Sequence, residues 1–576
     1  MDQVDLPGTH HILRAWQYAC FDVIKKPTSE GNVMIIYNEP SNAFIAHVLE
    51  QRIEDVLLDK VKEKINHSVS GSEIRSWTNS LPQMAKVIRD ADLASDTHVL
   101  LEYKLPSSEK RIDFLITGEN EAGIQNALIV ELKQWQKSQV ADGDGIVKTF
   151  LGKGIRETVH PSYQSLSYQR YLENFNEALY DDTSIQLSSC SYLHNYIQDR
   201  HNEPLLDDRY QNYLRQSPVY FQFDDRELTT AIKEKVANGK GADIASRIEH
   251  GRIRPSKKLV ESVQSLLEGN EEFILLDEQK VAYEKVLAVY QQADLETAQK
   301  EVVLIKGGPG TGKSVIGLNL MNDFLKDEAN VEYITPNQSF REILKKKLVG
   351  RSGFTEVRNL FKGSGSYTQT PENYFDVLIC DEAHRLKNQG HMQKKIEGEN
   401  QATQIMRASK ISVFFIDDEQ MISKKDIGNV KLIQEEAEKQ GAILHEVELD
   451  SQFRCGGSGN FLEWLDNVLF EQGKDIPLEG DFDFQLVDSP NELYDKVVEE
   501  KDGRLVAGYA WEWNKELVNG ELPKDVAIEA ADFAMPWNDP NRIDWAFTRK
   551  DGNRLAASIP FKGSRWVMWV SLSEMI

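Results

Sequence analysis

Residues 301–321 read EVVLIKGGPGTGKSVIGLNLM, which places an apolar strand, a glycine-rich loop and a helix in immediate succession. The loop fits the pattern G-x-x-x-x-G-K-[S/T] through four residues and has a further glycine inside it: Gly307, Gly312, Lys313, Ser314 and Gly310. Glycines let backbone amides approach phosphates, and the start of the following helix favours negative charge. At average residue usage this pattern arises by chance about 0.02 times in such a chain. We therefore predict an ATP site, with Lys313 on the outer phosphates and Ser314 on Mg²⁺.

A second apolar strand, FDVLICDEAHRL at 375–386, ends in two adjacent carboxylates. A bare Asp-Glu pair is usually a solvated turn. Here it follows a buried strand downstream of the glycine-rich loop, which favours a functional interpretation. The pattern predicts Asp381 as a magnesium ligand and Glu382 as the residue that faces the attacking water.

Strands and helices alternate from about residue 273 onward, which is typical of a parallel α/β sheet. The N-terminal half differs, because three strand-like segments follow each other closely: HVLLEYKL (98–105), RIDFLITG (111–118) and NALIVELKQW (126–135). They predict a small mixed sheet. Apolar periodicity predicts helices over 43–65 and 161–180, and mostly helical connecting segments over 190–265.

Two carboxylates and a lysine lie on neighbouring strands of this predicted mixed sheet. Asp113 lies on RIDFLI, while Glu131 and Lys133 share one face of IVELKQW because alternate strand residues point the same way. Two carboxylates can hold a divalent cation, and a lysine beside them can orient or deprotonate water. Glu102 on the preceding strand is a further candidate acid. The alternative interpretation is a half-exposed strand pattern without chemistry.

Composition narrows the possible functions. The 576-residue chain carries a net charge of −25, which argues against a broadly basic coat for nucleic acid but permits a local basic groove. Its four cysteines form neither a disulfide framework nor a zinc pattern, which favours a reducing compartment. The sequence has no run of about 18 apolar residues and no signal pattern. We predict a cytoplasmic protein without membrane contact.

The order of the nucleotide motifs resembles a superfamily 1 helicase core, most closely the bacterial helicase domain grouped with Schlafen-type helicases, over about 273–544. The resemblance implies an adenine-reading glutamine at Gln279 in LLDEQ and a segment that carries single strand at YITPNQSFREIL (333–344). It implies a coupling motif in VFFIDDEQMIS, with Asp417 and Gln420. In LDSQFRCGG it supplies Gln452 and Arg454, of which Arg454 corresponds to the γ-phosphate sensor.

The carboxylates and lysine of the mixed sheet resemble the PD-(D/E)xK nuclease family, although Ile112 replaces the leading proline. The downstream helix carries Gln164 and Tyr168, which resemble the Q-x-x-x-Y element of RecB-like nucleases. That element adjoins the site and the DNA. The resemblance implies Mg²⁺ or Mn²⁺ at Asp113 and Glu131.

The resemblances divide the α/β chain into a restriction-endonuclease-like mixed sheet, a P-loop RecA-like parallel sheet and a partial second RecA-like domain. The boundaries are an N-terminal extension at 1–33, a nuclease domain at 34–190, a helical connector at 191–268, a first RecA-like domain at 269–480 and a truncated second one at 481–576. Purine-rich codons before Met34 lead us to hypothesise that the native start lies there.

The helicase resemblance continues through GRLVAGYAWEW (503–513) to WNDPNRIDWAF (537–547) and then stops. The family continues with T-x-Q-G-x-E and an arginine from the second domain. Back-translation of the tail in a shifted frame from about 554 gives residues that resemble this missing part, so we hypothesise a frameshift near 551–554. Loss of such an arginine would lower nucleotide hydrolysis by about 10³- to 10⁵-fold. The apolar tail would then be an exposed liability or a makeshift edge strand.

Together the resemblances imply an ATP-binding, Mg-dependent nuclease-helicase that acts on DNA or RNA, with an impaired motor. Such combined proteins are associated with bacterial immunity against phages and other foreign nucleic acid. Two other interpretations remain open from the sequence. One is a nucleotide-gated switch that binds nucleic acid without cutting it, and the other is a non-functional product of a broken gene.

Overall fold

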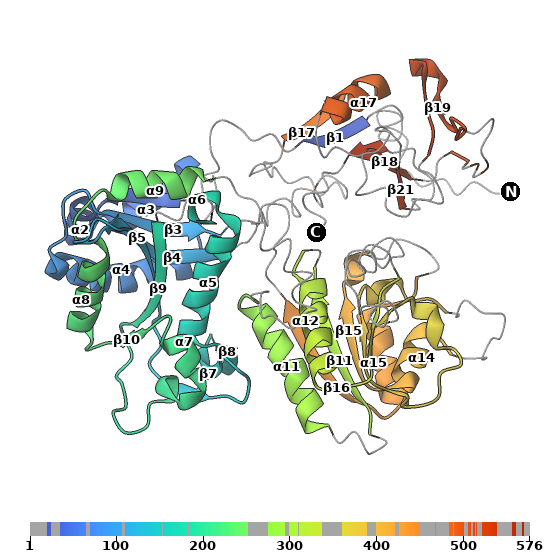
Figure 1. Ribbon diagram of the computed structural model, residues 1–576, viewed down its shortest axis with the longest axis horizontal. Helices are drawn as coiled ribbons and strands as arrows, with labels where there is room; N and C mark the ends of the chain where they lie inside the picture. The colour runs from blue at the N-terminus through green and yellow to red at the C-terminus, as the bar shows by residue number, and fades with distance from the viewer. Residues whose placement is uncertain are drawn as a thin grey trace.

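The computed structural model describes most of the chain between residues 20 and 569. The described residues are 20–24, 35–64, 69–105, 110–152, 154–180, 185–251, 275–293, 299–308, 310–336, 360–388, 399–420, 426–449, 467, 483–487, 489–499, 505–508, 511, 512, 514, 516, 521–537, 556–559 and 567–569. They form three main sheets with their helices (Figure 1).

The first sheet has six strands in the order β10-β9-β5-β4-β3-β2. Their bounds are β2 Ile35–Pro40, β3 His98–Lys104, β4 Arg111–Glu119, β5 Gln125–Leu132, β9 Ile185–Leu193 and β10 Val219–Phe221. Strands β2 to β5 pair antiparallel, whereas β9 and β10 join parallel, so the sheet is mixed as predicted. The three predicted strands are its centre, β3, β4 and β5.

Helices cover both faces of the first sheet, which is why its central strands are buried along almost their whole length. One face packs against α2 Ser41–Leu49, α3 Ile53–Lys64, α4 Gly71–Ala91 and α8 Asp225–Val236. The other packs against α5 Pro161–Phe175, α6 Glu177–Tyr180 and α9 Gly241–His250. The start of α9 touches the sheet backbone, because a Cβ at Gly241 would lie 2.3 Å from the Thr117 carbonyl oxygen.

Three segments differ from the sequence prediction. The helix expected over 43–65 is divided at Gln51, whose φ of 56° is left-handed, and the one over 161–180 is divided at Asn176. The segment 190–265 is not mainly a connector in its described part, because β9, β10, α8 and α9 all join the first sheet. Strand β9 was not predicted because it is rich in serine. Ser189 and Ser191 are nevertheless buried, since their hydroxyls bond to Ser217 and Ser165.

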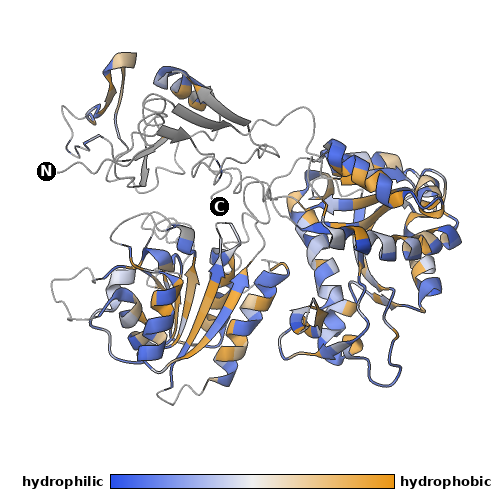
Figure 2. Cartoon of the chain, turned by 180° about the vertical axis from the view of Figure 1, so that it is seen from behind, coloured by the Kyte–Doolittle hydropathy of each residue, from blue (hydrophilic) through white to orange (hydrophobic). Residues whose placement is uncertain are grey.

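The second sheet is parallel throughout, in the order β13-β12-β14-β15-β11-β16. Its strands are β11 Glu301–Gly307, β12 Val331–Ile334, β13 Phe361–Lys362, β14 Phe375–Cys380, β15 Ser409–Ile416 and β16 Ile443–Leu449. Helices α11 Glu278–Gln292 and α12 Lys313–Lys326 cover one face, and α14 Gln401–Ala408 and α15 Val430–Lys439 cover the other. Figure 2 shows the apolar residues concentrated on these strands. The predicted parallel α/β sheet is confirmed.

The third sheet combines one strand from early in the described chain with four strands from late in it, in the order β17-β1-β22-β18-β21. Its strands are β1 Cys20–Ile24, β17 Asp483–Val487, β18 Leu505–Gly508, β21 Ala556–Ile559 and β22 Val567–Trp569. Helix α17 Pro490–Glu499 and the hairpin β19 Val526–Ile528 and β20 Phe533–Met535 lie beside it. Among the described strands, β1 pairs with β17 antiparallel and β18 with β22 antiparallel, which differs from the parallel sheet that a RecA-like domain implies.

A small antiparallel sheet of β6 Ser138–Val140, β7 Ile146–Leu151 and β8 Gly154–Val159 projects below the first sheet. Across the described parts of the chain, we find no helix with the length and apolar character needed to cross a bilayer.

Candidate functional site

The glycine-rich loop connects β11 to α12, and two of its carbonyl groups bind the side chain of Lys313. Gly310 and Gly312 have φ values of 81° and 84°, which side-chain-bearing residues rarely adopt. The ammonium nitrogen of Lys313 lies 2.6 Å from the carbonyl oxygen of Gly307 and 2.7 Å from that of Gly308. The predicted phosphate-binding lysine therefore lies against the loop.

Asp381 follows β14 and faces the start of α12. Its Oδ2 accepts hydrogen bonds from the Ser314 hydroxyl and the Tyr333 hydroxyl, both at 2.7 Å, and its Oδ1 accepts one from the Glu382 amide. Burial raises the pKa of Asp381, and the neighbouring charge of Glu382 raises it further. The structure thus brings together the hydroxyl and the carboxylate predicted as magnesium ligands, and oxygen donors of this kind suit Mg²⁺.

Glu382 adopts a left-handed backbone conformation, with φ of 55°, which is costly for a residue with a side chain and is common at functional sites. Its Oε2 lies 3.0 Å from Nε2 of His384. Burial alone would raise the pKa of Glu382, but the interactions with His384 and Lys313 outweigh burial and lower it. The side chain is therefore ionised near neutral pH, as a residue that accepts a proton must be.

The other predicted nucleotide residues separate into three groups. Gln279 lies on the loop, because its Nε2 donates to the Thr311 carbonyl at 3.0 Å. Gln420, on a short helix at Asp418–Gln420, instead donates to Asp417 Oδ2 at 2.8 Å. Arg454 and Gln452 lie outside the described residues, as does most of the segment 333–344.

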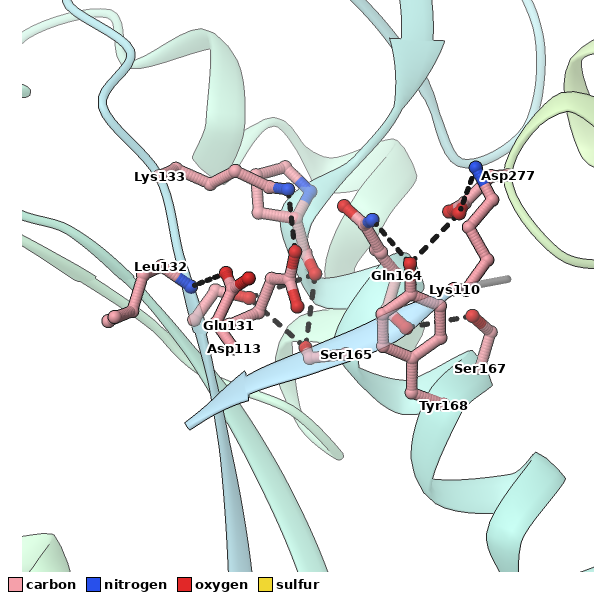
Figure 3. Close-up of polar contacts among 12 residues, drawn as sticks. Lys110, Asp113, Glu131, Leu132, Lys133, Gln164, Ser165, Ser167, Tyr168 and Asp277 are labelled. Atoms are coloured by element: carbon pink, nitrogen blue, oxygen red, sulfur yellow. Dashed lines mark hydrogen bonds and ion pairs between the residues drawn. The ribbon is translucent and has the colours of Figure 1, made fainter. Parts of the chain in front are cut away.

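Asp113, Glu131 and Lys133 meet on adjacent strands of the first sheet (Figure 3). The register of Phe114 with Val130 places Asp113 opposite Glu131. Asp113 Oδ2 accepts the Leu132 amide at 2.9 Å, and Lys133 Nζ donates to Glu131 Oε1 at 2.7 Å. These three side chains form what we call the carboxylate site.

The carboxylate site concentrates negative charge in a buried place. Glu131 is only 3% exposed, and its Oε2 accepts no hydrogen bond from the part of the chain that the structure describes. Burial raises the pKa of Asp113 and of Glu131; the charge of Glu131 adds to the shift of Asp113, and Lys133 opposes both shifts. A buried anionic oxygen without a partner is costly, so the site favours a cation.

Within the described ranges, no group of three or more His, Cys, Asp and Glu side chains is arranged to hold a metal ion. The carboxylate site therefore offers two carboxylates rather than a complete cage. Mg²⁺ is commonly bound in this way, through one or two carboxylates, with waters and phosphate oxygens as its other ligands.

The remaining predicted residues lie around this site. Glu102 occupies the position opposite Asp113 on β3, but its φ of 54° interrupts the ladder, and its Oε1 accepts the Trp77 indole at 2.6 Å. Gln164 Nε2 donates to the Tyr168 hydroxyl at 2.8 Å, as Figure 3 shows. Tyr168 is 2% exposed, so in this structure it packs in the core and does not offer a face to a base.

Sequence reasoning missed several residues that complete the two sites: Tyr333 and His384 beside Asp381 and Glu382, and Lys110 and Asp277 beside Tyr168. Two of them had a local signal, because His384 follows the Asp-Glu pair and Asp277 stands in LLDEQ. The roles of Tyr333 and Lys110 depend on contacts between segments far apart in the sequence.

The parallel sheet, the glycine-rich loop and the carboxylates after β14 are the features of a helicase-like P-loop ATPase domain. Residues 300–557 match the family model for the Schlafen group 3 DNA/RNA helicase domain. The first sheet lies outside this match.

Comparison with known proteins gives distant relatives. The uncharacterized protein YPL245W of Saccharomyces cerevisiae is 24% identical over 322 residues, which are 45% of this chain, and the chain spans 65% of that relative. Among solved structures, FlaH, a flagellar accessory protein from Methanocaldococcus jannaschii, has 15% identity and a TM-score of 0.17, over 24% of this chain and 67% of its own. AMPPCP-bound DnaA from Aquifex aeolicus has 20% identity and a TM-score of 0.19, over 37% of this chain and 56% of its own.

Proposed function

We propose that the chain is an ATP-binding, Mg-dependent nuclease-helicase that cuts DNA or RNA at the carboxylate site and serves in defence against foreign nucleic acid. The observation that carries the proposal is the meeting of Asp113, Glu131 and Lys133 in a protein that also has a helicase-like P-loop domain. Neither the carboxylate site nor the P-loop domain alone would suggest that a motor moves a strand to a site of cleavage.

In the nuclease part, Asp113 and Glu131 would hold a divalent cation through carboxylate oxygens. The bound ion would supply Lewis acidity toward a phosphate oxygen and lower the pKa of a bound water. Lys133 keeps its ammonium group beside Glu131, where it can orient a water molecule or compensate developing negative charge. The partly buried setting strengthens these interactions relative to bulk water.

In the P-loop part, Lys313 would bind the outer phosphates, and Ser314 with Asp381 would bind the nucleotide's Mg²⁺. Glu382 would accept the proton of the attacking water at its carboxylate. Gln279, which lies on the loop, would read the base. Gln420 would belong to the coupling motif, and Arg454 would sense the γ-phosphate.

Cleavage of matched single-stranded DNA, double-stranded DNA and RNA in Mg²⁺, with and without ATP, tests the proposal. We expect Lys133→Met to lower the rate about 10²- to 10⁴-fold, the usual contribution of a positioned proton-transfer group, and Asp113→Asn to lower it at least as much. Lys148→Met, which removes an exposed lysine paired with Glu157 on the β7–β8 hairpin, is the matched control and should cut normally.

Equal cutting by the wild type and both site variants would remove the nuclease assignment. Nucleotide-dependent binding of DNA or RNA without any cutting would favour the alternative of a nucleotide-gated binding switch.

A further inference from the structure

One short segment, Leu275 to Val281, belongs to two hydrophobic cores at once. Leu275 packs in the core of the P-loop sheet, whereas the adjacent Leu276 packs with Tyr168 in the core of the first sheet. Further along, Val281 packs against the β6–β8 region, and the Tyr163 hydroxyl donates to the Leu275 carbonyl at 2.7 Å. The segment is therefore fixed to both parts of the protein.

Asp277 lies in the middle of this segment and points at the Q-x-x-x-Y pair. Its Oδ2 accepts the Tyr168 hydroxyl at 2.9 Å and lies 3.1 Å from Lys110 Nζ. Tyr168 in turn accepts the Gln164 amide, and Figure 3 shows Gln164 between Tyr168 and the carboxylate site. A chain of hydrogen bonds thus leads from Asp277 in the P-loop part through Tyr168 to Gln164, and the charge of Asp277 also raises the pKa of Glu131 in the carboxylate site.

Asp277 has features that oppose stability. Its side chain is 9% exposed, its φ of 38° is left-handed, and its Oδ1 is buried without a hydrogen-bond partner among the described residues. A strained residue with an unsatisfied buried oxygen costs free energy. Such a cost is expected where a residue positions a site rather than where it only fills a core.

Two residues further on, the same segment touches the glycine-rich loop. Gln279 binds the Thr311 carbonyl through Nε2 and the Leu276 amide through Oε1. The contact is close, because a Cβ at Gly312 would lie 2.1 Å from Gln279 Nε2. A nucleotide that changes this contact therefore acts within two residues of Asp277.

We propose that Asp277 is a positioning residue of the carboxylate site, supplied by the nucleotide-binding part of the chain, and that it links nucleotide binding to cleavage. Asp277 holds Tyr168 and Lys110, and Gln279 holds the other end of the segment on the loop. The effect on cleavage rests on the proposed function, whereas the coupling between the Asp277–Tyr168 contact and nucleotide affinity can be measured without cleavage.

The first measurement is a double-mutant cycle on cleavage, with Asp277→Asn and Tyr168→Phe. We expect each variant to lower kcat about 10- to 100-fold, as loss of a supporting contact does, while KM stays within about twofold. The double variant should be no worse than either single one, because Asp277 acts through Tyr168. Asp144→Asn is the matched control, since Asp144 joins the same two parts through Lys280 but does not contact Tyr168; it should cut normally.

The second measurement needs no cleavage. Affinity for a fluorescent non-hydrolysable ATP analogue should change about fivefold or more in Asp277→Asn and in Tyr168→Phe, the lower range for coupled sites. It should stay unchanged in Asp144→Asn. Asp277 and Gln279 belong to one segment, so a substitution that breaks the contact between Asp277 and Tyr168 should also change how Gln279 lies on the loop, and with it the affinity for the analogue.

The outcomes separate the two proposals. If the wild type cleaves, and Asp277→Asn matches it in both cleavage rate and analogue affinity, the inference is wrong and the proposed function stands. No cleavage by the wild type, with analogue affinity shifted by both variants, would overturn the proposed function and support the link. Equal effects of Asp277→Asn and Asp144→Asn would also overturn the inference, because general loosening would then explain both.

Discussion

Asp381 receives two hydroxyl donors on one carboxylate oxygen, Ser314 from α12 and Tyr333 from β12. Hydrogen bonds to a charged group contribute about 1.5–3 kcal/mol each. They fix the carboxylate against the start of the helix that follows the glycine-rich loop. The sequence predicted the partnership with Ser314, because both residues belong to local motifs, but it did not predict Tyr333.

Substitution of Lys313 tests whether this residue binds the nucleotide phosphates. We expect Lys313→Ala to weaken binding of a fluorescent ATP analogue in Mg²⁺ by at least about tenfold, because it removes a charged hydrogen bond worth about 1.5–3 kcal/mol. Fluorescence anisotropy would measure the affinity. Lys306→Ala is the control, since Lys306 lies on β11 just before the loop and pairs with Glu446. Retained affinity in Lys313→Ala would remove the assignment of the phosphate-binding loop.

At the scale of elements, α5 begins with a histidine cap. His160 Nδ1 accepts the Ser162 amide at 3.1 Å, its Nε2 lies 3.0 Å from the Leu205 carbonyl oxygen, and its ring stacks on Tyr210. Nδ1 can accept only while the ring is neutral, and burial lowers the pKa of His160 from 6.5 to about 4. The two hydrogen bonds and the ring contact give His160 a structural role.

This cap predicts a pH dependence of stability. The unfolded state takes up a proton near pH 6.5 and the folded state only near pH 4, so stability falls as the pH is lowered between these values and is unaffected above them. The loss is about 3 kcal/mol at most. Protection factors for amide exchange in α5, which correct for the slower intrinsic exchange at low pH, should therefore fall more steeply from pH 6.5 to 4.5 in the wild type than in His160→Asn, which can still cap the helix.

His201→Asn serves as the comparison for that experiment, because His201 is exposed. It should keep the wild-type slope. An unchanged slope in His160→Asn would show that other groups cause the acid sensitivity.

For the molecule as a whole, α11 joins the small β6–β8 sheet and α5 to the P-loop sheet. Lys280 lies 3.1 Å from Asp144 Oδ2 and 2.7 Å from Glu284 Oε1, and its side chain is 9% exposed. It also lies over the rings of Tyr163 and Tyr283. One buried cation thus connects residues of both parts.

We expect Lys280→Met to destabilise this junction by about 2–3 kcal/mol. Removing one partner of a fully buried ion pair costs about 3–5 kcal/mol, and the cost is smaller here because Asp144 is half exposed. Hydrogen exchange should show the loss as faster exchange in α5 and α11. Lys431→Met, which breaks an exposed pair with Glu435, should leave exchange unchanged. Equal exchange in Lys280→Met and wild type would contradict this role.

Local sequence patterns were enough to predict the features that lie in short, continuous stretches: the loop of 307–314, the carboxylates after β14, and strands β3, β4 and β5. Of these strands, β4 carries Asp113 and β5 carries Glu131, with Lys133 directly after it. Periodicity and motif spacing act over a few residues, so they predict local structure and the face on which a side chain lies. They did not predict β9, because its polar residues are typical of loops. They also did not predict the division of a helix at Gln51, where a single residue is left-handed.

Which segments meet depends on the tertiary structure. It joined Tyr168 to Asp277 across 109 residues, β1 near residue 20 to β17 near residue 485, and Tyr333 to Asp381. Such contacts depend on how strands are ordered within a sheet and on which helices share a core, and no local pattern specifies that order. The physical link between the two candidate sites is for this reason a property of the folded chain.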